Sequence, residues 1–524
     1  DQALCEGMNL LVWHAFTCSP KEMGMPGQEY FAGTHFNPQN FTFTKSQDFL
    51  KYINRSQFIL QQGNFVADVL EYYGDNSPNF TQMKGSNTAK SLPDYNYDTA
   101  SEEALLTRIS VKDGIIHLPD GTNYKVLVLP ERDSISAAIL QKLKKWVVED
   151  GLTLIGPKPV RVTGLSGGAE ADAAVQKIAG LLWGAEKISA GAKIRNVGKG
   201  RVASGITAKE LLNRDKLPPD FERISGTNKT PRIDTIHRVI YNNQTAAINL
   251  KNFDEFSPKE VLVTPAEEIS GIGAHIYFVA NLAAKPDAAE CAFRVTGLQP
   301  EFWDALTGER RLCKAFRQEA GRTIIPLDLA AFGSVFVVFR GNIPETQRGP
   351  AAANTPELLS VFPLAGAWDV SFAPKWGGPE KVVFEELISW DKHPDPRVRF
   401  YSGPAVYRKT VNLPADFFAG VTNGERLILR LGEVAEIAEV RLNGRALGTV
   451  WARPYEIDIT GALHSGGNVL EIEVVNHWAN RVIGDASLPP AQRLTRTNIR
   501  RLTAKVPLVK SGLIGPVEFL RQRE

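Results

Sequence analysis

Polar side chains gather in a loop near the start of the chain, where they could bind a small ligand. An apolar run over residues 7–13 ends at His14, and a long polar loop follows it. Within this loop Glu29 is a carboxylate that could serve as an acid, a base or a cation ligand. His35 and Asn37 lie beside glycine and proline residues, which restrict the backbone and so could aim polar groups at a ligand.

The same residues also have a structural interpretation. His14 could be a core histidine that hydrogen-bonds to the backbone, and the loop could be an ordinary ordered surface loop. Glu22 and Glu29 are the carboxylates of this loop. Chemistry between two carboxylates, such as glycosidic cleavage, needs a pair in a fixed arrangement. Both interpretations stay open at this point.

A second cluster of polar and aromatic residues lies near the C-terminus. Trp478 could stack on a sugar ring, while Asn476 and Asp485 could hydrogen-bond to hydroxyl groups. The alternative, which we favour, is an internal packing motif of Trp and Arg that holds the domain together. A third cluster, formed by Asp94, Tyr95, Tyr97 and Asp98, is interpreted in the same way as a packed loop between domains.

Length and composition describe a globular chain of several domains. The 524 residues predict roughly three or four domains. The formal net charge of +2 leaves no basic excess for nucleic acid, and no apolar stretch is long enough to predict a membrane span. The four cysteines and the lack of a CxxC pair argue against a disulfide framework and a structural zinc site.

The first 62 residues predict the last part of a β/α barrel. The run from Gly7 to His14 is interpreted as a buried strand, and residues 46–62 as the amphipathic helix that follows the loop. Ser46 could cap this helix and Gly63 could end it. A strand that leads into a long polar loop is how such a barrel builds a site. The earlier strands would then precede Asp1.

Residues 63–205 predict a doubly wound α/β domain. Strands are expected at 65–70, 124–130 and 152–155, with a helix over 136–150 whose apolar side packs on the sheet. The order resembles a flavodoxin-like or amidotransferase-like fold. Amidotransferase chemistry needs a cysteine nucleophile, and none lies between Cys18 and Cys291, so this domain is predicted to be structural.

The second half of the chain predicts two all-β domains. Short strands over 206–345 indicate a β-sandwich, and residues 342–356 have the composition of a linker. Residues 357–524 predict a jelly roll that resembles a sugar-binding domain. There the Asn443-Gly444 pair between two alternating strands is a strong hairpin signal. The fold class is therefore multidomain α/β plus all-β.

The order of short motifs resembles the C-terminal half of glycoside hydrolase family 106, the α-L-rhamnosidases. The terminal domain also resembles the galactose-binding-like jelly roll of family 2 glycosidases. The matching segments run through nearly the whole chain, at 7–14, 26–27, 33–36, 60–69, 118–130, 236–238, 302–308, 401–403, 480–485 and 511–517. One departure is the stretch of about 37 residues between 238 and 276, which suggests a longer hairpin in the sandwich.

The resemblance implies an inverting hydrolase that removes α-linked L-rhamnose from plant polysaccharides or glycosides. Its two catalytic carboxylates are expected upstream of Asp1, with a calcium ion near the sugar hydroxyls. Substrate-binding roles are then expected for five residues: Asn9, His14, Glu29, His35 and Asn37. The expected partner is a carbohydrate, not nucleic acid or membrane. Relatives act in the periplasm or outside the cell, although no signal peptide is recognisable in this sequence.

Two other functions remain as alternatives. The chain could be a non-catalytic carbohydrate-binding or scaffold protein, with the jelly roll as the working domain. A family 2-like β-galactosidase is the weaker alternative, since only the terminal domain supports it. Under the main hypothesis this chain alone is expected to be inactive, because a barrel that lacks most of its strands cannot close.

Overall fold

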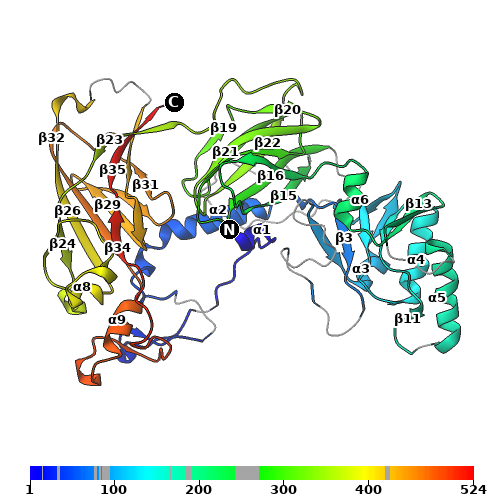
Figure 1. The fold of residues 1–524 in the computed structure, drawn as a ribbon, viewed down its shortest axis with the longest axis horizontal. Helices are drawn as coiled ribbons and strands as arrows, with labels where there is room; N and C mark the ends of the chain where they lie inside the picture. The colour runs from blue at the N-terminus through cyan, green and yellow to red at the C-terminus, as the bar shows by residue number, and fades with distance from the viewer. Residues whose placement is uncertain are drawn as a thin grey trace. The chain divides into compact units, whose positions relative to one another are not determined.

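The computed structural model describes residues 1–14, 16–31, 36–75, 80–81, 84, 95–165, 167–184, 191–241, 271–418 and 425–523. It divides into two compact units, one made of Asp1–Asn9 and Arg55–Asn354, the other of Leu10–Asn54 and Thr355–Glu524 (Figure 1). The first unit holds a parallel α/β sheet and a β-sandwich, and the second unit holds another β-sandwich. Across the described ranges, no helix is both long and apolar enough to cross a membrane.

A twisted parallel sheet forms the core of the α/β part of the first unit, as predicted. Neighbouring strands are parallel throughout, except that β12 runs antiparallel at one edge. The strand order is β12 (Lys193–Val197), β13 (Gly200–Ser204), β10 (Thr153–Ile155), β8 (Val126–Val128), β3 (Val69–Tyr72) and β4 (Tyr97–Ala100).

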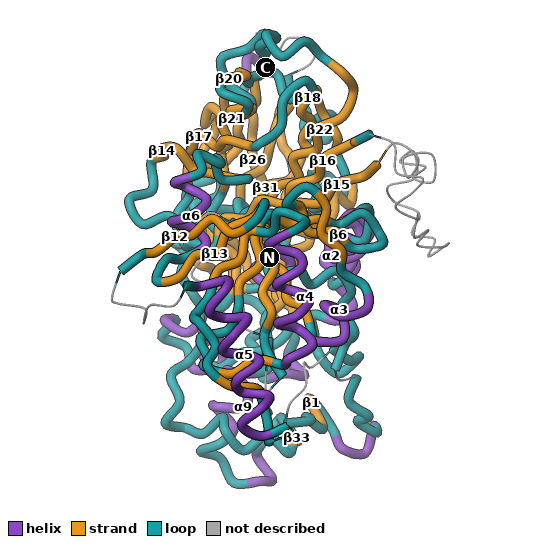
Figure 2. The backbone as a smooth tube through the Cα atoms, turned by 90° about the vertical axis from the view of Figure 1, so that its right-hand side faces the viewer, coloured by secondary structure: helices purple, strands orange, loops and turns teal. Residues whose placement is uncertain are grey.

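Helices cover both faces of this sheet, which explains why its strands are apolar on both sides. Figure 2 shows three of them side by side, and their apolar side chains share one core with the sheet. These are α3 (Glu102–Thr107), α4 (Ala137–Val148) and α5 (Gly168–Trp183). The buried side of α4 is the predicted one, including Leu140 and Trp146. On the other face α6 (Ala208–Arg214) packs Leu211 into a second core, after a capping box of Thr207 and Glu210.

The central sandwich, residues 219–354 of the first unit, packs two antiparallel sheets around an aromatic core that includes Phe293 and Phe339. One sheet contains β14 (Phe221–Gly226), β17 (Asp287–Phe293), β21 (Arg322–Leu329) and β20 (Arg317–Glu319). The other contains β19 (Arg310–Leu312), β18 (Leu298–Trp303), β22 (Ser334–Asn342), β16 (Ile272–Asn281), β15 (Ile233–Tyr241) and β2 (Asn64–Phe65). Strands β16, β17 and β22 cover the predicted positions.

The predicted strand at 65–70 is divided in the structure. Its first part is β2, which pairs with β15 of the central sandwich, and its second part is β3 of the parallel sheet. Between them Val66 donates its amide to the carbonyl of His237. One chain segment therefore links the two parts of the first unit.

A buried polar network lies in the first unit, where its two parts meet. Asp68 is buried and pairs with Lys125 and with Arg294, at 2.6 and 2.9 Å. Arg294 also lies 3.6 Å from Asp220. Buried charges are tolerated when each has a partner, so the network specifies this packing.

The same network continues through two histidines. Asp220 contacts Nδ1 of His237 at 2.9 Å, and Nε2 of His237 lies 2.9 Å from Nδ1 of His275. Burial acts to raise the pKa of Asp220, but His237 and Arg294 outweigh it and hold that pKa at about 2. Burial lowers the pKa of His275 to about 3, and the neighbouring His237 adds to this shift.

The second unit contains the C-terminal sandwich, residues 355–523. One sheet contains β23 (Glu357–Pro363), β35 (Glu518–Arg523), β27 (Arg426–Arg430) and β31 (Glu456–Asp458). The other contains β25 (Val382–Phe384), β24 (Trp368–Phe372), β26 (Pro404–Leu413), β32 (Gly466–Val475), β29 (Ile437–Leu442) and β30 (Arg445–Val450). Asn443 and Gly444 have φ of +54° and +79°, as the predicted two-residue hairpin turn requires.

Short elements complete the described chain. The helices are α1 (Gln2–Cys5), α8 (Pro396–Arg399) and α9 (Ala479–Asp485). The 3-10 turns are η1 (Lys21–Met23), η2 (Phe43–Lys45), η6 (Pro374–Trp376), η7 (Trp390–Lys392), η8 (Ala415–Phe418) and η9 (Pro490–Gln492). Three small sheets of the described chain have two strands each: β1 (Pro26–Gly27) pairs with β33 (Arg496–Thr497), β9 (Ser134–Ile135) with β11 (Arg161–Val162), and β28 (Glu433–Ala435) with β34 (Gly512–Gly515). A further small sheet has three strands, in which β6 (Ile115–His117) lies between β5 (Ser110–Lys112) and β7 (Asn123–Tyr124).

The predicted strand over Gly7–His14 is wrong for this structure. Residues 8–13 have no regular secondary structure, and Leu10 and Val12 are 61% and 81% exposed. A strand needs a neighbour to pair its backbone groups, and no described strand lies beside this run. The helix after the loop is confirmed as α2 (Gln47–Leu60), followed by Gly63 at φ +61°.

The predicted cap of α2 has a different role in the structure. The Ser46 hydroxyl donates to the carbonyl of Phe43 at 2.6 Å, so it closes the preceding turn η2. The Ser46 carbonyl accepts the first helical hydrogen bond, from the amide of Leu50. The boundary between the two units falls inside α2, between Asn54 and Arg55.

The depressed pKa of His275 predicts that stability falls as the pH drops. The folded chain keeps the His275 imidazole neutral, whereas the unfolded chain protonates it below the ordinary pKa of 6.5. The free energy of unfolding is therefore unaffected by this group above pH 6.5 and decreases progressively as the pH falls towards 3. We expect His275→Gln to reduce the loss of thermal stability between pH 7.5 and 5. The control is His117→Gln on β6, which should keep the wild-type pH dependence. Equal pH slopes for wild type and His275→Gln would contradict the prediction.

Candidate functional site

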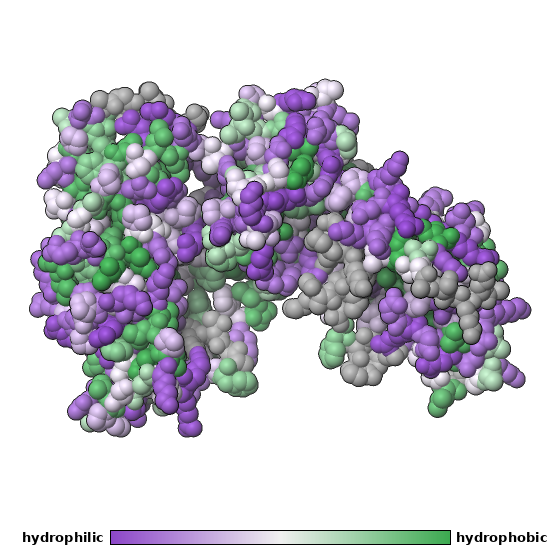
Figure 3. Space-filling model, viewed as in Figure 1, coloured by the Kyte–Doolittle hydropathy of each residue, from purple (hydrophilic) through white to green (hydrophobic). Residues whose placement is uncertain are grey.

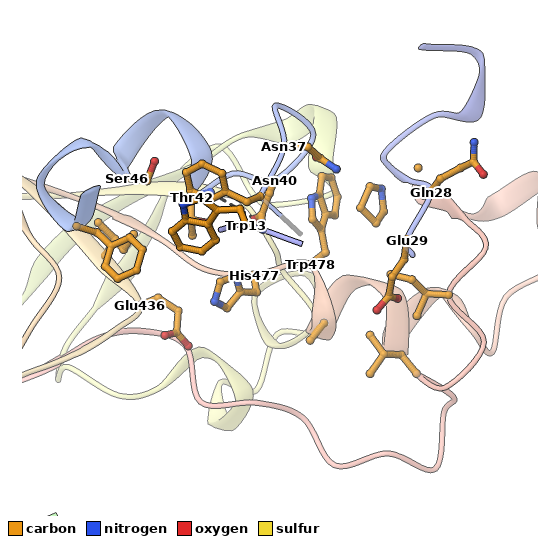
Figure 4. A pocket seen from close by; sticks show the side chains of 18 of the residues that line it. Trp13, Gln28, Glu29, Asn37, Asn40, Thr42, Ser46, Glu436, His477 and Trp478 are labelled. Carbon is orange, nitrogen blue, oxygen red and sulfur yellow. Dashed lines mark hydrogen bonds between the residues drawn. The ribbon is translucent and has the colours of Figure 1, made fainter. Parts of the chain in front are cut away.

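A pocket of about 710 Å³ lies in the second unit. One side is formed by described residues between 13 and 49. Among them, we call residues 16–31 and 36–46 the site loop. The other side is formed by loops and strand ends of the C-terminal sandwich, at 436–437, 451, 477–479 and 499–502. Figure 4 shows side chains from both sides around this pocket.

Aromatic rings form one continuous wall of the pocket. Trp13 stacks on Phe36 with ring centroids 5.0 Å apart and meets Phe49 edge to face at 6.1 Å. Phe49 in turn contacts Trp451 of the C-terminal sandwich at 5.2 Å. Rings in this arrangement offer a flat apolar surface while their polar edges stay available, which suits a ligand with one apolar face.

Backbone pairing fixes the site loop to the C-terminal sandwich. Strand β1 pairs in parallel with β33, so that Pro26 and Gly27 lie opposite Arg496 and Thr497. Asn498 extends this pairing, because its side chain accepts from the amide of Glu29 at 2.7 Å and donates to the Glu29 carbonyl at 3.0 Å. A loop without long strands is thereby held in one conformation.

Trp478 provides a second attachment of the site loop. Its indole Nε1 donates to the carbonyl of Gln39 at 2.7 Å, and its ring stacks on Phe41 at 4.1 Å. Trp376 contacts the same indole edge to face at 5.0 Å. Trp478 is 6% exposed, so most of its surface is used for packing and only an edge faces the pocket.

Two carboxylates reach the pocket from different chain segments. Glu29 comes from the site loop and forms an ion pair with Arg501. Glu436 comes from the C-terminal sandwich, just before β29. In the view of Figure 4, His477 and Trp478 lie between them. The pocket therefore combines an aromatic wall with acceptors and donors that could bind hydroxyl groups.

Of the five predicted binding residues, two line the pocket in the described part of the structure. Glu29 and Asn37 line the pocket, although the Asn37 side chain is buried and accepts from the amide of Gln39. His14 is exposed, contacts Tyr30 and is not among the lining residues. Asn9 belongs to the first unit, where its carbonyl accepts from Gln61. His35 lies outside the described residues.

The C-terminal cluster has mainly a structural role, which is the alternative that the sequence favoured. The buried Asn476 accepts from the amide of Gly403 and donates to the Tyr401 carbonyl. Asp485 is also buried, accepts from Thr495 and lies 2.9 Å from the Arg481 guanidinium. Neither residue lines the pocket, whereas Trp478 does.

The described residues of the third cluster also pack internally, and Asp94 lies outside them. The Tyr124 hydroxyl donates to Asp98 at 2.8 Å, and the Tyr95 hydroxyl donates to Asn213 and to the Leu217 carbonyl. These contacts fix the edge of the parallel sheet. The tyrosines therefore serve packing, as the sequence analysis favoured.

Sequence reasoning missed several pocket residues. Glu436, Trp451, His477 and Arg501 come from separate loops of the C-terminal sandwich, and only the tertiary structure brings them to the site loop. Trp13 was included only as part of an apolar run. A signal was present in Trp13 itself, because an aromatic side chain beside a polar loop is a common feature of binding sites.

The described residues assign no ligands to the calcium ion that the family resemblance implies. No group of three or more His, Cys, Asp or Glu side chains suited to a metal occurs within the described ranges. The carboxylate of Glu29 is already paired with Arg501. Calcium takes six to eight oxygen ligands, which can be amide and backbone carbonyl oxygens as well as carboxylates. The calcium ion stays a prediction.

Comparison with known families connects both sides of the pocket to sugar-cleaving enzymes. Residues 1–256 match the glycoside hydrolase family 106 model, described as alpha-L-rhamnosidase. We call residues 1–256 the family 106 region, after the model that they match. Residues 379–504 match the glycosyl hydrolase 2 galactose-binding domain-like model. The family 106 region supplies the site loop, and the galactose-binding-like domain supplies the opposite wall.

The chain is similar to a solved rhamnosidase and to proteins named as beta-glucuronidases. A rhamnosidase from Novosphingobium sp. PP1Y is 30% identical, with a TM-score of 0.74 over 95% of this chain and 43% of that one. A Formosa agariphila protein named "Putative beta-glucuronidase" is 24% identical over 99% of this chain and 60% of its own length. A Bifidobacterium dentium beta-glucuronidase matches 33% of this chain and 31% of its own at 26% identity, with a TM-score of only 0.23. The chain thus spans about half the length of the first two.

The attachment of the site loop by Trp478 predicts a large effect of its removal. Trp478→Ala should cost about 3–5 kcal/mol, as for other buried aromatic residues, and leave the Gln39 carbonyl unpaired. We expect faster amide hydrogen exchange in residues 36–45, with Trp478→Phe intermediate because it keeps the stacking on Phe41. Phe80→Ala, which removes an exposed aromatic side chain of the first unit, is the matched control. Unchanged exchange in Trp478→Ala would show that the loop is held elsewhere.

Proposed function

We propose that the pocket of the second unit is a monosaccharide subsite of an α-L-rhamnosidase, and that this chain supplies the C-terminal part of that enzyme. The observation that carries the proposal is the joint construction of one aromatic pocket. The family 106 region contributes Trp13, Phe36 and Glu29, and the galactose-binding-like domain contributes Glu436 and Trp451.

The lining suits a deoxy sugar such as L-rhamnose. This sugar has a methyl group in place of one hydroxymethyl group, so one part of the ring is more apolar than in common hexoses. Trp13 and Phe49 could pack against that part, because their rings face the pocket as a continuous wall. Asn40 and Glu436 could hydrogen-bond to the hydroxyl groups on the other side.

Glu29 is suited to orienting the substrate. Its carboxylate is held by Arg501 and its backbone by Asn498, so it stays in one position. A carboxylate fixed in this way can accept hydrogen bonds from two hydroxyl groups of a sugar. In this proposal Glu29 binds and orients the sugar, and the catalytic pair of an inverting enzyme, spaced roughly 6.5–9.5 Å apart, is supplied from outside the chain.

The barrel assignment belongs to the same proposal. We propose that residues 1–62 complete a β/α barrel in the whole enzyme, that residues 63–205 form a flavodoxin-like or amidotransferase-like domain without a nucleophile, and that the C-terminal sandwich is a jelly roll. The match of residues 1–256 to the family 106 model supports the barrel, although residues 8–13 form no strand in this structure. Action in the periplasm or outside the cell is also part of the proposal.

A non-catalytic carbohydrate-binding function is the second candidate. It is favoured by the fact that the pocket lies entirely within the second unit of this chain, so it can bind a sugar without a barrel. Both functions predict that this chain binds sugar. Only the rhamnosidase function predicts that the whole enzyme hydrolyses it. Galactosidase activity has the weaker support of the terminal domain alone.

Binding to the pocket predicts a specific effect of Trp13. We expect isothermal titration to detect L-rhamnose or a short rhamnoside, with about tenfold weaker binding in Trp13→Ala through the loss of one stacking surface. Glu357→Gln, an exposed carboxylate on β23, is the control and should bind as the wild type does. Binding that is unaffected by Trp13→Ala would remove the pocket from consideration.

A hydrolysis assay compares this chain with the whole enzyme. This chain should not hydrolyse an aryl α-L-rhamnoside, because in the proposal it lacks the catalytic carboxylates. The same assay on a protein that extends the chain to the full length of its relatives should show release of the aryl group. Robust hydrolysis by this chain alone would contradict the placement of the catalytic carboxylates outside the chain. Inactivity of the extended protein together with retained sugar binding would favour the second candidate.

A further inference from the structure

A second cavity, of about 460 Å³, lies at one end of the central sandwich. Three connections converge there, at residues 227–232 between β14 and β15, 282–286 between β16 and β17, and 330–333 between β21 and β22. All three belong to the first unit, and none contributes to the pocket described above.

The buried residue Asn281 fixes these connections to one another. Its side-chain nitrogen donates to the carbonyls of Lys285 and Ala330, at 2.8 and 2.9 Å, and its side-chain oxygen accepts from the amide of Ala283 at 3.0 Å. The amide of Leu282 donates to the Arg232 carbonyl at 2.7 Å. The cavity is therefore preformed, and a ligand would lose little binding energy to ordering it.

Phe332 is held at the edge of the cavity in an unfavourable conformation. Its φ is +57°, which is uncommon for a bulky residue, and its side chain is 56% exposed. The amide of Phe332 donates to the Ala283 carbonyl at 3.1 Å, which maintains this turn. A glycine would fit the backbone better and would not expose a ring, so the aromatic side chain is kept at a cost.

The polar groups of the cavity are predominantly cationic or hydrogen-bond donors. Arg232 and Lys285 are exposed, and neither forms an ion pair within the described ranges. Among the residues that the structure describes, no acidic side chain lines the cavity. Asn228 is buried with its side-chain oxygen accepting from the amide of Thr230, which orients its Nδ2, and this nitrogen has no partner in the described part of the chain.

We propose that this end of the central sandwich is a second saccharide site, which binds an acidic sugar residue. The ring of the sugar stacks on Phe332, and its carboxylate or sulfate group is bound by Arg232 and Lys285. A sugar is favoured because the chain carries a family 106 region and a galactose-binding-like domain. The inference does not depend on rhamnose as the substrate of the other pocket.

The choice of an acidic ligand follows from a contrast between the two cavities. The pocket of the second unit contains carboxylates that can accept from hydroxyl groups, whereas the described lining of this cavity contains two cations and no anion. A neutral sugar would leave Arg232 and Lys285 without a charged partner. An anionic sugar satisfies both cations and uses the exposed ring.

Binding of an acidic oligosaccharide to this chain tests the site. We expect tri-galacturonate to bind at 50 mM salt and to bind much more weakly at 500 mM, because exposed ion pairs are screened. Phe332→Gly and Arg232→Gln should each weaken binding at least tenfold. Phe332→Gly is compatible with the local backbone, so the melting temperature should not fall. Phe80→Ala and Lys112→Gln, two exposed residues of the same unit, are the matched controls.

The outcomes separate this site from the other pocket. Trp13→Ala should leave tri-galacturonate binding unchanged, and Phe332→Gly should leave rhamnose binding unchanged. Binding of a sulfated trisaccharide with the same dependence on Phe332 supports the site and shows that either anionic group suffices. Equal binding of a neutral trisaccharide, tighter binding of a dinucleotide, or no effect of Phe332→Gly would overturn the proposal.

Discussion

The site depends on how an irregular segment satisfies its backbone hydrogen bonds. The described residues between 8 and 46 form two short 3-10 turns and a two-residue strand, so the C-terminal sandwich must supply partners for many of their polar groups. Asn498 and Trp478 do so, at Glu29 and at the Gln39 carbonyl. Each of these contacts also positions a side chain in the pocket. Shape and binding chemistry of the site therefore arise from the same contacts.

Local patterns predicted the elements whose stability comes from nearby residues. Helices α2 and α4 and the Asn443-Gly444 turn follow from periodicity and turn chemistry. The predicted strand at 7–14 failed because apolar residues alone do not form a strand, which also needs a paired neighbour. The division of 65–70 between two sheets was missed for a related reason, because pairing partners distant in sequence decide where a strand ends.

The candidate site could be predicted only on its loop side. Glu29 and Asn37 were found because polar residues beside glycine and proline are a local signal, whereas Glu436 and His477 carry no such signal in their own segments. For Asn476 and Asp485 the sequence contained a binding signal, but both side chains hydrogen-bond to backbone amides of neighbouring loops instead. Burial distinguishes these cases, and burial is a property of the tertiary structure.

Charge separates two surfaces that a survey of aromatic residues would group together. Figure 3 shows that hydrophilic side chains cover much of the visible surface of each unit. The charges and hydrogen-bonding groups around an exposed aromatic ring therefore indicate which kind of ligand it could bind. Around Trp13 they include carboxylates, amides and a histidine, which can bind the hydroxyl groups of a neutral sugar. Around Phe332 the charged neighbours are cations. A chain that binds a polysaccharide of both neutral and acidic sugars would need both surfaces. One set of side chains cannot bind neutral and acidic sugar units equally well.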